Sequence, residues 1–282
     1  MAWHDDKGKI VFLCTFVMLI FVIFSIQSIQ QLRESNRMRE KDERVESQND
    51  LALALFKTDG DFLAYELNNS EFYKTGESRF LTRHDSLIAR LNGLFQVFSD
   101  DEAEESSIAT DLKQYDSIFD NMVAKIKERG YRDYGLEGTM RSKAHEIEKK
   151  KLIPEVDYLR LRRHEKDYLL RADSNYIHKF DSLMKKYVAT NVAATSLLQE
   201  YSKSLHDFAS ISDIIGLETQ TNLKANLDRH GHNLLDAIKK RDMSIDETIY
   251  RIHHNGIILF IVGMIGSTIV CFSLIVIIIK KT

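Results

Sequence analysis

The stretch that decides the fold is Ile10–Ile26, which reads IVFLCTFVMLIFVIFSI and contains no charged residue. A second uncharged stretch, Gly256–Ile279, reads GIILFIVGMIGSTIVCFSLIVIII near the other end of the chain. A helix that crosses a bilayer needs about 20 predominantly apolar residues. With their flanking residues both stretches reach that length. We therefore predict two transmembrane helices, at 10–30 and 255–279, that bracket the rest of the chain.

The first span is expected to stay attached to the mature protein. Residues 25–31 read SIQSIQQ, which lacks the small-residue pattern of a signal-peptide cleavage site. Two spans place both ends of the chain on the same side of the membrane, and Lys280 and Lys281 favour the cytoplasm. Five basic residues between 33 and 44 oppose this orientation. Long domains translocate largely regardless of their charge, so we give that conflict little weight.

These considerations predict a two-pass protein of a bacterial inner membrane. Its expected parts are a cytoplasmic N-terminus (1–9), the first span, an extracytoplasmic domain (31–254), the second span and a cytoplasmic stub (280–282). Nothing in the sequence follows the second span except Lys280, Lys281 and Thr282. We therefore expect any cytoplasmic output domain to come from a longer parent chain or from another subunit.

Composition predicts an all-α fold for the region between the spans. The 282 residues include one proline and twelve glycines. Proline lacks a backbone donor and clashes inside a helix, so its scarcity permits long helices. Apolar periodicity and turn residues then predict the following helices: 31–67, 78–98, 103–129, 136–171 with an interruption at Pro154, 176–206, and 211 onward. We expect the last of these helices to continue into the second span as one rod.

Several classes of function find no support in the sequence. The net charge of -3 gives no reason to expect nucleic-acid binding. Cys14 and Cys271 lie inside the apolar stretches, so the domain between them has neither a disulfide nor a cysteine-ligated metal. His230 and His232 are two residues apart, so a helix would point them in different directions. We find no glycine-rich nucleotide loop and no catalytic motif, and we expect no catalytic residue, cofactor or metal.

Two charged segments are the most informative part of the domain. Residues 159–173 read LRLRRHEKDYLLRAD, and residues 135–148 read GLEGTMRSKAHEIE. In helical register, charges fall where a bundle core needs apolar side chains, so these charges must form pairs or contact water. The first interpretation is a structural charge network of Glu148, Glu165, Lys166 and Arg171. The second is contact with an anionic ligand through Arg141, His145, Arg162 and Arg163, because guanidinium groups bind carboxylates well.

On these two segments, in this order and at this separation, the chain resembles the helical bimodular sensor domain of bacterial chemoreceptors and sensor histidine kinases. The flanking spans and helix lengths extend the resemblance over most of the chain. The outer regions, 31–130 and 180–254, match only in helical character. The resemblance implies two stacked four-helix bundles that share long helices. It also implies a homodimer that binds a small molecule, often an organic acid, or a periplasmic binding protein.

The function predicted on this basis is that of a sensor module in a transmembrane signal receptor. Ligand binding would shift a helix and pass the change through the second span to a chemotaxis or histidine-kinase output. A full-length parent could carry a kinase or cyclase, while this chain itself would not be an enzyme. The alternative is a helical spacer or adaptor that docks another membrane protein and senses nothing.

Overall fold

The computed structural model describes residues 2–96, 102–190, 195–216 and 222–279. The stub at 280–282 lies outside the described residues, as do the side chains of Cys14 and Cys271. Every described element is a helix, which confirms the all-α prediction. These helices are α1 (Ala2–Tyr65), α2 (Ser70–Thr75), α3 (Arg79–Gln96), α4 (Glu102–Arg129), α5 (Gly135–Lys149), α6 (Glu155–Arg171), α7 (Ser174–Thr190), α8 (Thr195–Ile215) and α9 (Leu223–Ile279).

The chain divides into two compact units. Unit 1 comprises Met1–Asn49 and Ile238–Thr282, and unit 2 comprises Asp50–Ala237. Helices α1 and α9 contribute residues to both units and run without a break through the boundary. The prediction that the last helix continues into the second apolar stretch is therefore confirmed.

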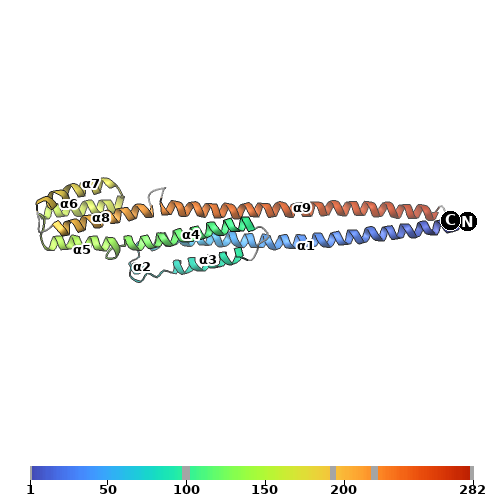
Figure 1. Cartoon of the computed structure of the whole chain (residues 1–282), viewed down its shortest axis with the longest axis horizontal. Helices are drawn as coiled ribbons and strands as arrows, with labels where there is room; N and C mark the ends of the chain where they lie inside the picture. The colour runs from blue at the N-terminus through green and yellow to red at the C-terminus, as the bar shows by residue number, and fades with distance from the viewer. Residues whose placement is uncertain (1, 97–101, 191–194, 217–221, 280–282) are drawn as a thin grey trace. The chain divides into compact units, whose positions relative to one another are not determined.

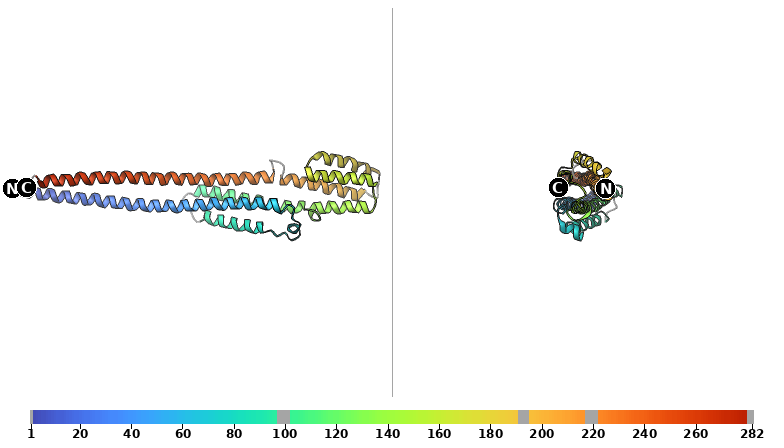
Figure 2. Two further views of the ribbon diagram at one scale, coloured as in Figure 1. Left: turned by 180° about the vertical axis from the view of Figure 1, so that it is seen from behind. Right: turned by 90° about the vertical axis from the view of Figure 1, so that its left-hand side faces the viewer.

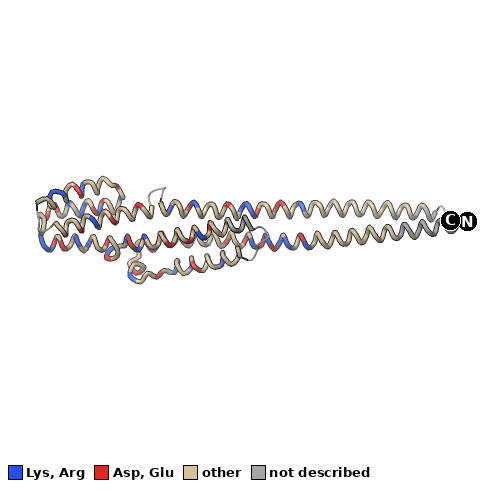
Figure 3. Tube along the Cα trace, in the orientation of Figure 1, with Lys and Arg blue, Asp and Glu red and all other residues tan. Residues whose placement is uncertain are grey.

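Unit 1 consists of the first part of α1 and the last part of α9, which lie side by side (Figures 1 and 2). The amide of Gln31 on α1 donates a hydrogen bond of 2.6 Å to the carbonyl oxygen of Ile252 on α9. Figure 3 shows no charged residue along the described apolar stretches of the two helices. Within the described residues, both helices are long and apolar enough to cross a membrane.

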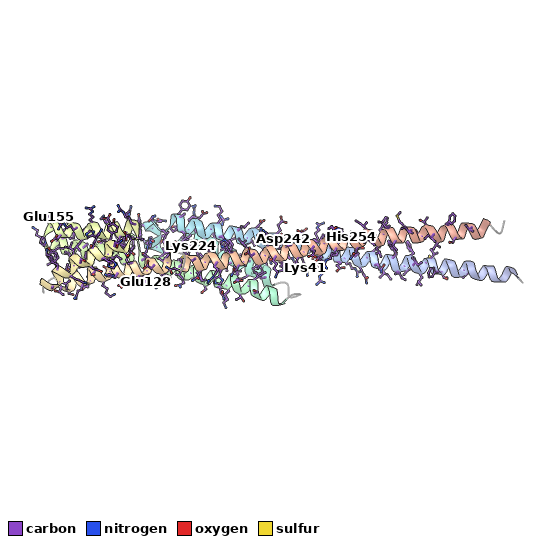
Figure 4. All side chains as sticks on the ribbon, turned by 90° about the horizontal axis from the view of Figure 1, so that it is seen from above. Lys41, Glu128, Glu155, Lys224, Asp242 and His254 are labelled. Carbon is purple, nitrogen blue, oxygen red and sulfur yellow. The ribbon has the colours of Figure 1, made fainter. Side chains whose placement is uncertain are left out.

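Most of the described side chains of these apolar stretches are exposed. Phe21 is 66% exposed and Phe260 is 58% exposed, and both belong to long runs of exposed aliphatic and aromatic residues. Exposed apolar surfaces of this extent mark contact with lipid or with another protein. Figure 4 labels Lys41, Asp242 and His254, which lie in unit 1 outside the apolar stretches.

In unit 2, the end of α1 packs with α2, α3 and α4. Phe62 of α1 contacts the rings of Phe72 and Phe119 edge-on, with centroids 5.3 and 5.6 Å apart. All three side chains are at most 1% exposed. Leu227 and Leu234, from the start of α9, are also buried. These residues form the apolar interior of this half of unit 2.

The remaining helices of unit 2, α5 to α8, bury a common core. It includes Met140 and Ile147 of α5, Leu161 of α6, Phe180 of α7 and Tyr201 of α8. Figure 1 shows these four helices together at one end of unit 2. The apolar residues recur at helical spacing on each element, so each helix presents one stripe to this core.

The predicted single helix at 176–206 is wrong, because the structure has two helices there, α7 and α8. In a continuous helix Phe180 and Tyr201 would be about 30 Å apart. Instead their ring centroids lie 5.1 Å apart in an edge-to-face contact. The segment between the two helices contains neither glycine nor proline, so nothing in its composition signalled the break. Burial of both aromatic rings favours the folded-back arrangement.

The predicted unbroken helix from 211 onward is also wrong. Helix α8 ends at Ile215, and α9 begins at Leu223. Gly216 has φ of +72°, and its N–H donates to the carbonyl oxygen of Ser212 at 3.0 Å. This left-handed conformation favours glycine and terminates helices. The region predicted as a turn at 68–77 contains the short helix α2.

Candidate functional site

Most of the charged segment 159–173 lies on α6, which begins after Pro154 and ends where Ala172 adopts φ of +48°. Its fully buried carboxylate, Glu165, is 1% exposed. Arg162, one turn earlier, donates to Oε2 of Glu165, and the hydroxyl of Tyr201 donates to the same oxygen. Burial lowers the pKa of Arg162, but Glu165, Tyr201 and Tyr158 together outweigh burial, so the pKa is raised. The ion pair of Arg162 with Glu165 and the hydrogen bond from Tyr201 therefore connect α6 to α8.

The other three predicted ligand residues lie apart from this pair. Arg141 faces Asp133 at 3.5 Å, and His145 faces Glu148 at 3.4 Å. Arg163 is mostly exposed, with Asp167 3.6 Å from its Nε atom. None of these residues, and not Arg162 either, lines the cleft described below.

The predicted network residues take separate roles. Glu148 accepts a hydrogen bond of 3.1 Å from the hydroxyl of Tyr158. Burial raises the pKa of Tyr158 to about 12. Arg171 donates to the hydroxyl of Tyr176 at 2.6 Å, at the exposed end of α6. Lys166 lines a cleft in unit 2. Arg162 and Glu165 therefore form a buried pair, whereas Glu148 and Arg171 each make a hydrogen bond to a nearby tyrosine.

The cleft has a volume of about 460 Å³ and lies within unit 2, among residues of α4, α5, α6 and α8 and the segments that join helices. Small-molecule sites in proteins usually have volumes of about 300–1,000 Å³. Its lining residues are Asn68, Arg129, Tyr131, Glu137, Lys166, Tyr168, Leu169, Leu170, Ala172, Phe208, Ser212, Asp213 and Gly216. The lining thus combines cations, carboxylates and aromatic rings.

Gly130, in the loop after α4, and Gly138, on α5, allow this loop and the start of α5 to approach closely. At Gly138, a Cβ atom would lie 2.3 Å from the carbonyl carbon of Asp133. At Gly130, a Cβ atom would lie 2.0 Å from the carbonyl oxygen of Tyr134. Only glycine allows this close approach between the first turn of α5 and the preceding loop. The glycines thereby place Glu137 of α5 and Tyr131 of the loop beside the end of α4.

Arg129, the last residue of α4, lines the cleft. Its guanidinium carbon lies 5.6 Å from the ring centre of Phe208, on α8. Its Nε atom is buried and has no hydrogen-bond partner, and the same is true of Oγ of Ser212. Buried polar atoms in proteins nearly always have a partner. The sequence does not distinguish Arg129 from other residues, because basic residues are common at the C-terminus of a helix.

Carboxylates oppose these cations. Burial raises the pKa of Glu137, and this effect outweighs the lowering by the backbone hydrogen bond from Arg132 and by the charges of Arg129 and Arg141. Asp213 also lines the cleft, on α8. A partly buried carboxylate of this kind gains stability from an additional nearby cation.

A second buried polar group lies in the other half of unit 2. Nδ1 of His84 is 2.8 Å from Oδ1 of Asp59, and Nε2 is 3.0 Å from Oδ1 of Asp116. The hydroxyl of Tyr115 donates to Oδ2 of Asp59 at 2.7 Å. Burial lowers the pKa of His84, but the two carboxylates outweigh burial and raise it. The ring also stacks on Phe119 at 4.2 Å between centroids.

This histidine group was not predicted, although the sequence carries a signal for it. His84 precedes Leu87 and Leu91 by three and seven residues, so it lies on the apolar stripe of α3. A histidine on such a stripe needs a polar partner, and Asp59 and Asp116 could have been sought on the facing helices.

Comparisons with protein-family models, with curated proteins and with solved structures find no match to this chain. The assignment of a function therefore depends on the helices and the site described above.

Proposed function

We propose that this chain is the sensor module of a transmembrane signal receptor in a bacterial inner membrane. In this proposal the apolar stretches of α1 and α9 cross the membrane, and unit 2 lies on the extracytoplasmic side. Unit 2 would work as two stacked four-helix bundles, and two copies of the chain would form a homodimer. The stimulus would be a small molecule or a periplasmic partner protein, and a cytoplasmic output would respond in chemotaxis or histidine-kinase signalling.

One observation carries this proposal. Two helices run without a break from long apolar stretches into a helical unit that contains a charged cleft. A helix with n residues is about 1.5n Å long, so it can pass a small shift or rotation from one end to the other. A ligand that binds one packing of the helices more tightly would change the populations of the two packings.

The spacer alternative shares the spans and the helices but predicts no response to ligands. A hybrid receptor separates the two. Residues 1–279 are joined to the cytoplasmic part of a histidine kinase whose activity drives a reporter gene in bacteria. Cells are then exposed to organic acids, amino acids, amines and nucleobases, and separately to periplasmic extract.

A reporter response that depends on dose supports the receptor proposal. A correctly inserted, stable hybrid that responds to no compound and to no extract would favour the spacer instead.

A further inference from the structure

The residues around Arg129 indicate which chemical groups a ligand of the cleft would need. Nε of an arginine is a donor only, so the partner of this buried atom must be an acceptor. Phe208 lies against the guanidinium group and limits the directions from which a partner can approach. A carboxylate is the group that best matches a guanidinium edge, because it accepts two parallel hydrogen bonds. Ser212 places a hydroxyl with no partner in the same cleft.

The formal charges of the lining are balanced. Arg129 and Lys166 contribute two positive charges, while Glu137 and Asp213 contribute two negative charges. A dicarboxylate would bring two further negative charges into a cleft that already contains two. A molecule with one carboxylate and one ammonium group keeps this balance, and its carboxylate supplies an acceptor for Nε of Arg129. Aromatic side chains of the lining can also contact an ammonium group.

We propose that this cleft binds a free amino acid as a zwitterion. Its carboxylate binds the Arg129 guanidinium and the Ser212 hydroxyl, and its ammonium group lies on the side of Glu137 and Asp213. This inference rests on the proposed receptor function and specifies its ligand class. It differs from the organic acid that the sequence resemblance implied.

The test measures unfolding of the full chain in lipid nanodiscs by differential scanning calorimetry. Each of the twenty L-amino acids is added at 1 mM, with malate as the dicarboxylate for comparison. We expect at least one amino acid to raise Tm by roughly 5–10 °C if its Kd is about 10 µM. Its amide, which lacks the carboxylate, and its analogue without the amino group should each bind at least about tenfold more weakly.

Variants connect the binding to this cleft. Arg129→Gln should abolish the shift, and Arg129→Lys, which keeps the charge but not Nε, should weaken binding at least about tenfold. Arg83→Gln, on the exposed surface of α3, is the matched control and should bind like the wild type. If Arg129→Gln lowers the Tm of the unliganded protein, the Arg129→Lys variant supplies the comparison.

Three results would overturn the inference. The first is that no amino acid raises Tm, and the second is that the rise in Tm survives in both Arg129 variants. The third is that malate, or the analogue that lacks the amino group, raises Tm as much as the amino acid does. A hybrid receptor that responds to another class of compound, independently of Arg129, would preserve the receptor function and reject the amino acid. Amino-acid binding with a silent reporter would preserve the site and reject the receptor.

Discussion

Replacement of Glu165 by glutamine should destabilise unit 2 strongly. Glutamine has nearly the same shape and keeps an oxygen that can accept from the Tyr201 hydroxyl. It removes the negative charge opposite Arg162, whose side chain is 13% exposed. Breaking a buried ion pair by removing one partner costs about 3–5 kcal/mol. Because Arg162 retains some contact with water, we expect a loss of about 3 kcal/mol, at the lower end of this range.

The assay is thermal unfolding of the full chain in nanodiscs, followed by circular dichroism. For domains of roughly 150–250 residues, 1 kcal/mol corresponds to about 2–4 °C, so Glu165→Gln should lower Tm by about 6–12 °C. Arg163→Gln, at a side chain that is 80% exposed, should change stability by less than about 0.5 kcal/mol.

A double-mutant cycle with Arg162→Met isolates the pair itself. The two changes together should cost less than the sum of the single changes, with a coupling energy of about 1–3 kcal/mol. A Tm within 2 °C of the wild type for Glu165→Gln, or a coupling energy near zero, would refute the reasoning.

Three further predictions follow from other parts of the structure. Gly138→Ala should destabilise the protein by about 1–3 kcal/mol, because its Cβ would overlap Asp133. Gly93→Ala, whose Cβ meets nothing within 4 Å, should stabilise the protein by about 0.5–1 kcal/mol. Chemical unfolding that ranks the two variants the other way would contradict this prediction. The pKa of His84 is raised in the folded protein, so its contribution to stability should be complete below about pH 6.5 and fall as pH rises through the raised value. Asp116→Asn should move this fall to lower pH, and melting curves between pH 6 and pH 9 that coincide for both proteins would argue against it. The orientation can be tested in a chain with Cys14 and Cys271 replaced by serine. A cysteine at the exposed position Lys149 should react with a membrane-impermeant maleimide on intact bacteria, and a cysteine at Lys7 should react only after lysis. The reverse pattern would place unit 2 in the cytoplasm.

Much of the fold could be predicted because its signals are local. The apolar stretches, the scarcity of proline and the helical spacing of leucines identify most helices within a few residues. The predicted helices at 103–129 and 136–171 leave a gap where the structure has the loop between α4 and α5, and the predicted interruption at Pro154 corresponds to the break before α6. The break between α7 and α8 could not be predicted, because it follows from the contact of Phe180 with Tyr201 and not from the residues at the turn.

The site was less predictable because it depends on contacts between distant segments. The sequence indicated that Arg162 and Glu165 needed partners, and it identified charged residues on α5 and α6. It could not indicate that Tyr201 would complete their network. Arg129 was overlooked because a basic residue at a helix end is ordinary until Phe208 and Ser212 are placed beside it.

The continuity of α9 has a consequence for changes in the length of the chain. In an α-helix each residue turns the chain by about 100°, so one inserted residue rotates everything beyond it by about that angle. An insertion of seven residues adds almost two full turns and restores the original direction to within about 20°. If α9 carries the signal, activity should vary periodically with insertion length between 238 and 255. The length of α9 would then determine the rotational angle, as well as the distance, between the sensing unit and the output domain.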